Sequence, residues 1–110
     1  HITCIVDKDH IIAISGASKK EFMDKNISSA LEKVINNRTT VIYSRSEPDF
    51  VPILDDDNES LYKNELITPI ISEGDVIGAI VLLSMDKKMG EVESKLAQTA
   101  AGFLGKQMEQ

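Results

Sequence analysis

One strand of this chain is predicted to be apolar on both of its faces. The segment PIISEGDVIGAIVLLS, residues 69–84, has two apolar runs that flank Glu73-Gly74-Asp75, a short connection with the composition of a tight turn. The second run, residues 76–84, shows no alternation of polar and apolar side chains. An antiparallel strand with one wet face alternates, so this strand must be central and covered on both sides.

Periodicity and turn residues divide the rest of the chain into strands and helices. Ser18 and Glu21 form a capping-box pair at the start of a short helix. Residues 44–64 are the least regular part, with two prolines and an acidic run, and long, partly apolar loops of this kind are often functional lids. The expected elements are strands over residues 2–6, 10–14, 41–43, 66–72 and 76–84, and helices that start near residues 18, 28 and 90, the last ending near residue 108.

This order predicts an α+β fold in which a central antiparallel sheet is flanked by helices on both faces. The last helix can cover one face, and the two short helices with the long loop cover the other. A sheet face with such a loose cover is where small-molecule sensor domains have their pocket. The side chains that we expect around this pocket are Ser15, Ser18, Ser44, Phe50 and Pro52.

The last helix has an apolar surface wider than one sheet face requires. Its apolar residues form two adjacent stripes, and we expect the stripe that contains Val92, Leu96 and Phe103 to cover the sheet. The second stripe would then be exposed on a monomer, where apolar patches usually mark interaction sites. We expect a contact between subunits at Ala97, Ala101, Leu104 and Met108. The alternative is a helix seated deeply in the core.

Composition limits the classes of function. The chain has 110 residues, 42% of them hydrophobic, which suits one domain over residues 1–110. Its net charge of −6 argues against nucleic-acid binding by this domain alone. The single cysteine, Cys4, is expected in the core and fits a cytoplasmic protein, and no apolar run approaches the ~20 residues of a membrane helix. Because a strand begins directly after His1, we expect a fragment of a longer protein.

The sequence contains no recognisable catalytic or metal-binding pattern. Counted from Asp55, the acidic run has Ser60 and Leu66 where an EF-hand loop needs Gly and Glu. His1 and His10 have no other His or Cys at the spacing of a zinc site. We therefore expect no metal, no cofactor and no enzymatic activity.

Three segments carry the pattern of a known family: ISGASKK at residues 14–20, the hairpin at residues 69–70 and 74–79, and the closing stretch over residues 86–110. They resemble the stage V sporulation protein T family of transcriptional regulators in endospore-forming bacteria. The resemblance implies a GAF domain, a sensor fold with a central antiparallel sheet. It also implies that DNA is bound only through an AbrB-like N-terminal domain that is absent from this chain.

Other activities of GAF domains do not match the chain. We find no signature of cyclic-nucleotide binding, and Cys4 alone does not suit methionine sulfoxide reduction or bilin attachment. Two hypotheses remain: a regulatory domain that senses an unidentified small molecule and forms homo-oligomers, and a pure assembly domain with no ligand. Convergent polar groups in the pocket would favour the first, and a purely apolar lining would favour the second.

Overall fold

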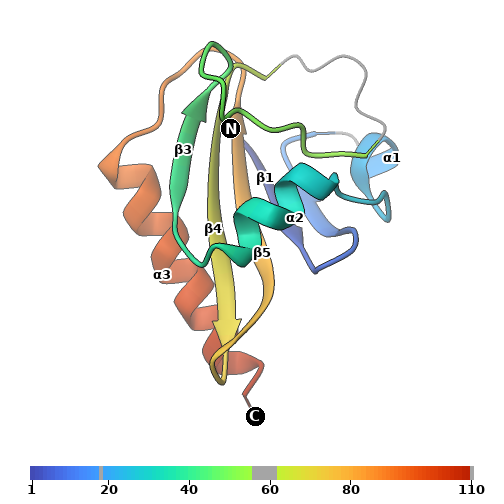
Figure 1. Cartoon of the computed structure of the whole chain (residues 1–110), viewed down its shortest axis with the longest axis vertical. Helices are drawn as coiled ribbons and strands as arrows, with labels where there is room; N and C mark the ends of the chain where they lie inside the picture. Colours follow the sequence, from blue (N-terminus) through green and yellow to red (C-terminus); the bar gives the residue numbers. More distant parts are fainter. Residues whose placement is uncertain (18, 56–61, 110) are drawn as a thin grey trace.

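The centre of the molecule is an antiparallel sheet of five strands in the order β2-β1-β5-β4-β3 (Figure 1). The structure is a computed structural model, and it describes residues 1–17, 19–55 and 62–109. The strands are β1 (Ile2–Val6), β2 (Ile11–Ser15), β3 (Val41–Ser44), β4 (Asn64–Ser72) and β5 (Asp75–Ser84), and the helices are α1 (Lys19–Phe22), α2 (Ser29–Asn36) and α3 (Glu91–Gln107).

β5 is the middle strand and is buried on both faces. Ala79, Val81 and Leu83 belong to the apolar cluster beneath α1, α2 and the β3–β4 loop. Ile80 points the other way, into the cluster beneath α3. Figure 1 shows α3 on one side of the sheet and α1 and α2 on the other. The prediction of a central strand covered on both faces, and with it the α+β fold class, is confirmed.

The β4–β5 hairpin closes as its sequence predicts. Glu73 and Gly74 have positive φ values of 51° and 85°, the conformation of a two-residue turn that matches the twist of antiparallel strands. β4 begins two residues earlier than expected, at Asn64. Pro69 is tolerated in this inner strand because β3 pairs with β4 only as far as Ile67, so the missing N–H of Pro69 faces no neighbouring strand.

α3 presents the opposite face to the one that we expected. Ala97 and Ala101 are each only 4% exposed and pack against the sheet, with Leu104 partly buried beside them. Val92 and Leu96 are instead 68% and 66% exposed. The assignment of the two stripes was therefore wrong. The small residues face inward because large side chains from β4 and β5 already fill the space beneath the helix.

Gly105 marks the closest approach of α3 to the sheet. A Cβ atom at this position would overlap the backbone carbonyl oxygen of Ile71 in β4. A Cβ atom at Gly102, three residues earlier, would meet nothing within 4 Å. The two glycines therefore differ in what they contribute, although they lie on the same helix.

We predict opposite effects of alanine at these two glycines. Gly105→Ala should lower the free energy of unfolding by about 1–3 kcal/mol, because the added methyl forces the helix away from β4. Gly102→Ala should raise it by up to about 1 kcal/mol, because alanine is the better helix former. Urea denaturation of both variants measures the difference. Equal stability of the two variants would contradict the close packing of α3 on β4.

Candidate functional site: the loop-covered face of the sheet

The described part of the loop between β3 and β4 is fastened over the sheet by α2. The hydroxyl of Ser28 accepts a hydrogen bond from the N–H of Leu31 at 3.0 Å and so caps α2. The same hydroxyl donates to the carbonyl oxygen of Pro52 at 2.6 Å. Ile53 and Leu54 are buried in the core on this side. One serine thus begins the helix and holds the loop.

A buried carboxyl group lies beneath this loop. Glu65 is the second residue of β4 and pairs in register with Leu83, so its side chain shares the sheet face covered by the loop. Its side chain is 0% exposed. One carboxyl oxygen, Oε1, accepts a hydrogen bond from the backbone N–H of Val51 at 2.9 Å. The other, Oε2, has no hydrogen-bond partner among the described residues.

The environment of Glu65 favours the neutral acid. Burial raises the pKa of this carboxyl to about 7, although the Val51 N–H and the positive charge of Arg45 act in the opposite direction. The group therefore changes its protonation near neutral pH. It can accept a hydrogen bond from a bound molecule when ionised and donate one when protonated.

The structure brings together only some of the side chains expected at a pocket. Ser44 ends β3 and its hydroxyl donates to Oδ1 of Asn64 at 3.2 Å, while Phe50 is half-buried under the guanidinium of Arg45. Pro52 contributes its carbonyl to the Ser28 contact. Ser15 is exposed at the end of β2, the outer strand on the opposite edge of the sheet from β3, and Ser18 lies outside the described residues. A pocket that includes all five side chains stays a prediction.

Glu65 was not found by sequence analysis. The irregular segment was expected to end at residue 64 and the strand to begin near residue 66, so Glu65 was assigned to neither. The signal that could have found it is the period-two spacing of Glu65 and Ile67, which places both on one strand face.

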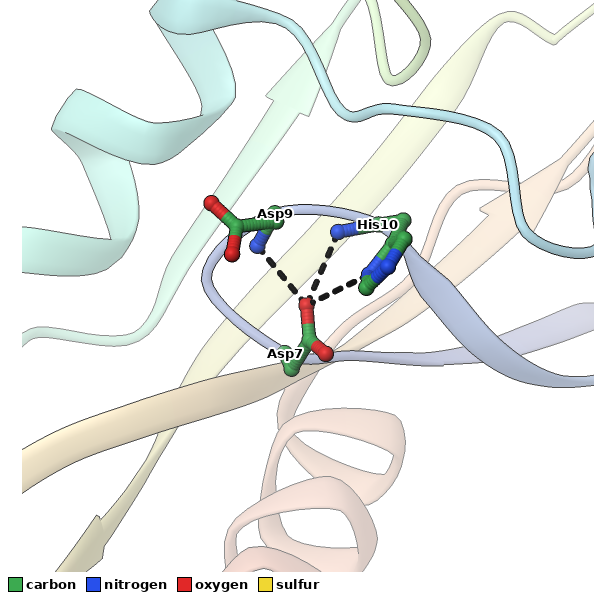
Figure 2. Close-up of polar contacts among 3 residues, drawn as sticks. All are labelled: Asp7, Asp9 and His10. Atoms are coloured by element: carbon green, nitrogen blue, oxygen red, sulfur yellow. Dashed lines mark hydrogen bonds and ion pairs between the residues drawn. The ribbon is translucent and has the colours of Figure 1, made fainter.

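The acidic turn between β1 and β2 shapes the chain locally. Oδ1 of Asp7 accepts hydrogen bonds from the backbone N–H groups of Asp9 and His10 at 2.7 and 2.8 Å, and it lies 3.0 Å from Nδ1 of His10 (Figure 2). The hydrogen bond and the charge of Asp7 raise the pKa of His10. Partial burial alone would raise the pKa of Asp7, but the contacts with His10 and Asp9 lower it. The cluster is an Asx-type turn that closes the hairpin.

Cys4 is buried and chemically quiet. Burial raises the pKa of its thiol to about 12, so it remains protonated at neutral pH and behaves as a small hydrophobic residue. Within residues 1–17, 19–55 and 62–109, no three His, Cys, Asp or Glu side chains come together as metal ligands. Of the acidic run, Asp55 is described and residues 56–59 lie outside the described residues.

Solved structures assign the fold to a class. The chain is similar to the GAF domain of a phosphoenolpyruvate-protein phosphotransferase from Coxiella burnetii, with a TM-score of 0.78 and 16% identity over 97% of this chain and 70% of that one. It is also similar to the cofactor-binding GAF domain of the nutrient sensor CodY from Clostridium difficile, with a TM-score of 0.73 and 16% identity over 97% of this chain and 74% of that one. The fold is that of a GAF domain.

Within this class, sequence comparison identifies the family. The chain belongs to the family described as stage V sporulation protein T C-terminal, transcription factor, which matches residues 1–109. It is 44% identical over 111 residues to stage V sporulation protein T of Bacillus subtilis (strain 168). The alignment covers 100% of this chain but 60% of that relative, so the chain spans less than two thirds of its length. The family resemblance of the sequence is confirmed.

We predict that Glu65 makes the stability of the domain fall as pH rises. Below about pH 4.5 both the folded and the unfolded states hold the proton. Between about pH 4.5 and 7 only the folded state keeps it, so the free energy of unfolding decreases across this window, by about 3 kcal/mol for the shift of this group. Glu65→Gln removes this contribution and should be more stable than the wild type at pH 8.

Urea denaturation from pH 4 to pH 8 tests this prediction. Glu32→Gln is the matched control, because Glu32 is exposed on α2 and the substitution removes the same charge. The control should follow the wild-type pH profile. A Glu65→Gln profile parallel to that of the wild type would show that Glu65 titrates normally.

Proposed function

We propose that this domain is the regulatory part of a sporulation transcription factor, where it senses a small molecule and takes part in oligomer formation. The buried carboxyl of Glu65 carries the sensing part of the proposal. A buried polar atom without a partner is costly, and most such atoms in proteins are satisfied. Oε2 of Glu65 is an exception in an otherwise apolar layer. A convergent polar group favours a sensor over a pure assembly domain.

The contact between Glu65 and Val51 supports a mechanism for sensing. Oε1 already holds the loop through the Val51 N–H, and Oε2 on the same carboxyl is buried without a partner among the described residues, so it could bind an N–H or O–H donor of a ligand once the loop moves. Such a ligand would bind between the loop and the sheet. The loop would have to adjust around it, and the occupied state would be favoured by the energy of the new hydrogen bond.

A thermal-shift screen of metabolites at pH 7 tests the sensing role. A ligand at 100 times its Kd should stabilise the wild type by about 2.7 kcal/mol. Glu65→Gln should lose most of this stabilisation, and Glu32→Gln should keep it. If a metabolite stabilises the wild type and Glu65→Gln equally, the ligand binds elsewhere and Glu65 has no part in sensing.

A second observation supports assembly through α3. Val92, Leu96 and Phe103 are 68%, 66% and 62% exposed and follow one another at intervals of four and seven residues. Intervals of this kind place side chains along one seam of a helix, as in paired helices. We propose a second copy of this chain as the partner, because in a twofold dimer the same stripe on each subunit packs against its counterpart and both are buried. Ala97, Ala101 and Leu104 pack towards the sheet, and Met108 follows their spacing at the end of α3 but is itself exposed.

We predict that Leu96→Glu weakens self-association and leaves the fold intact, because the side chain is exposed on the monomer. Sedimentation measures association and circular dichroism measures folding. Ser29→Glu adds the same charge at an exposed position of α2, on the other side of the sheet, and should associate like the wild type. A monomeric wild type at all accessible concentrations would refute the proposed pairing.

The remaining parts of the proposed role concern the whole regulator. The regulator would act in the cytoplasm and would bind DNA through a domain outside this chain. The GAF domain formed by this chain would not act as an enzyme. None of the helices in the described part of the chain has the length and apolar character that crossing a bilayer requires.

We predict that this chain alone does not bind duplex DNA at physiological salt, because its net charge is −6. Fluorescence anisotropy with labelled duplex measures this. A salt-sensitive complex of sub-micromolar Kd would contradict it.

A further inference from the structure

Positive side chains gather at one end of the sheet. β3 and β5 finish at this end of the sheet and β4 begins there, at the top of Figure 1. An open pocket of about 520 Å³ lies there, bordered by the connection from β5 to α3. Its lining includes Ser44, Arg45, Ser46, Lys63, Asp86 and Lys88.

The charge of this pocket is opposite to that of the chain. Arg45, Lys63 and Lys88 provide three positive charges, and Asp86 is the single carboxylate of the lining. The whole chain carries a net charge of −6. In the part of the chain that the structure describes, the one ion pair joins Asp7 to His10, so none of these three cations forms an ion pair with a described carboxylate.

The backbone holds two of the cations side by side. The N–H of Arg45 donates to the carbonyl oxygen of Lys63 at 2.7 Å, and the N–H of Lys63 donates to that of Ser84 at 2.9 Å. These bonds extend the sheet pairing past the ends of the strands. Like charges on directly opposed residues destabilise a sheet, so an anion bound between them would relieve a repulsion that the fold itself creates.

Contacts within the chain hold the side chain of Arg45 in place. Its Nε–H donates to the carbonyl oxygen of Tyr62 at 2.7 Å, and its guanidinium carbon lies 4.8 Å from the centre of the Phe50 ring. Both contacts restrict the side chain before any ligand arrives. The terminal guanidinium nitrogens form no hydrogen bond with the described residues, and their fork geometry matches the oxygens of a phosphoryl group.

We propose that this pocket binds the phosphoryl group of a small molecule. Within the lining, three cations against one carboxylate leave an excess of positive charge, which favours a phosphoryl group that carries close to two negative charges at neutral pH. The carboxylate of Glu47 lies beside the lining, because it accepts a hydrogen bond from the N–H of Ser44 at 2.8 Å. The hydroxyl of Ser46 provides a neutral hydrogen-bond donor at the rim, whereas the hydroxyl of Ser44 already donates to Asn64. This site goes beyond the sensing role proposed for the loop-covered face, and Glu65 is not among its lining residues.

The test is a titration of the chain with inorganic phosphate at pH 7.5, followed by ¹H–¹⁵N NMR at constant ionic strength with chloride as the balancing anion. We expect saturable shifts centred on the amides of Arg45, Lys63 and Lys88. Lys88→Gln should weaken binding about tenfold, the loss expected for one charge-assisted hydrogen bond. Arg45→Gln should do the same, and Asp86→Asn should tighten binding.

Lys33→Gln is the matched control, because Lys33 is exposed on α2 and the substitution changes the net charge equally. It should bind phosphate like the wild type. Shifts that do not saturate, or that persist unchanged in Lys88→Gln, would overturn the proposal. Equal affinity for acetate would overturn the assignment to a phosphoryl group. If Lys33→Gln loses as much binding as Lys88→Gln, the affinity depends only on the net charge of the chain, and the proposed site would be refuted.

Discussion

Burial of β5 on both faces is the constraint on which the rest of the structure depends. Val81 and Leu83 must be kept from water on one side and Ile80 on the other. A single layer of helices cannot do this, so the domain needs three layers. α3 provides the first cover as one long helix. α1, α2 and the β3–β4 loop share the second, which makes this cover the more adaptable of the two.

The shared cover explains where polar chemistry occurs in the core. A loop has backbone groups that need hydrogen-bond partners, and a helix satisfies its own. The hydroxyl of Ser28 donates a hydrogen bond to the carbonyl oxygen of Pro52, and the carboxyl of Glu65 accepts one from the N–H of Val51. The carboxyl of Glu65 therefore has a structural role toward the loop, and its second oxygen leaves a polar position within an apolar layer. The same residue links the folding of the loop to the proposed sensing.

How much could be predicted depended on whether the signal was local. The Glu73-Gly74 turn and the uninterrupted apolar run of β5 are local patterns, and both were interpreted correctly. The candidate site depends on contacts between distant segments. Ser15 and Ser44 seemed comparable in sequence, but strand order places them on opposite edges of the sheet. Glu65 becomes distinctive only because Val51, far along the chain, folds over it.

The last helix separates what the sequence determined by itself from what the tertiary structure decided. The sequence determined that α3 forms and that it has two apolar stripes, because helix propensity and a period of 3.6 residues act within one segment. Packing decided which stripe faces the sheet. The distance between helix and sheet depends on the side chains of both, and β4 already contributes large residues. Ala97, Ala101 and Gly105 allow the backbones to approach, whereas Leu96 and Phe103 in their place would hold the helix away.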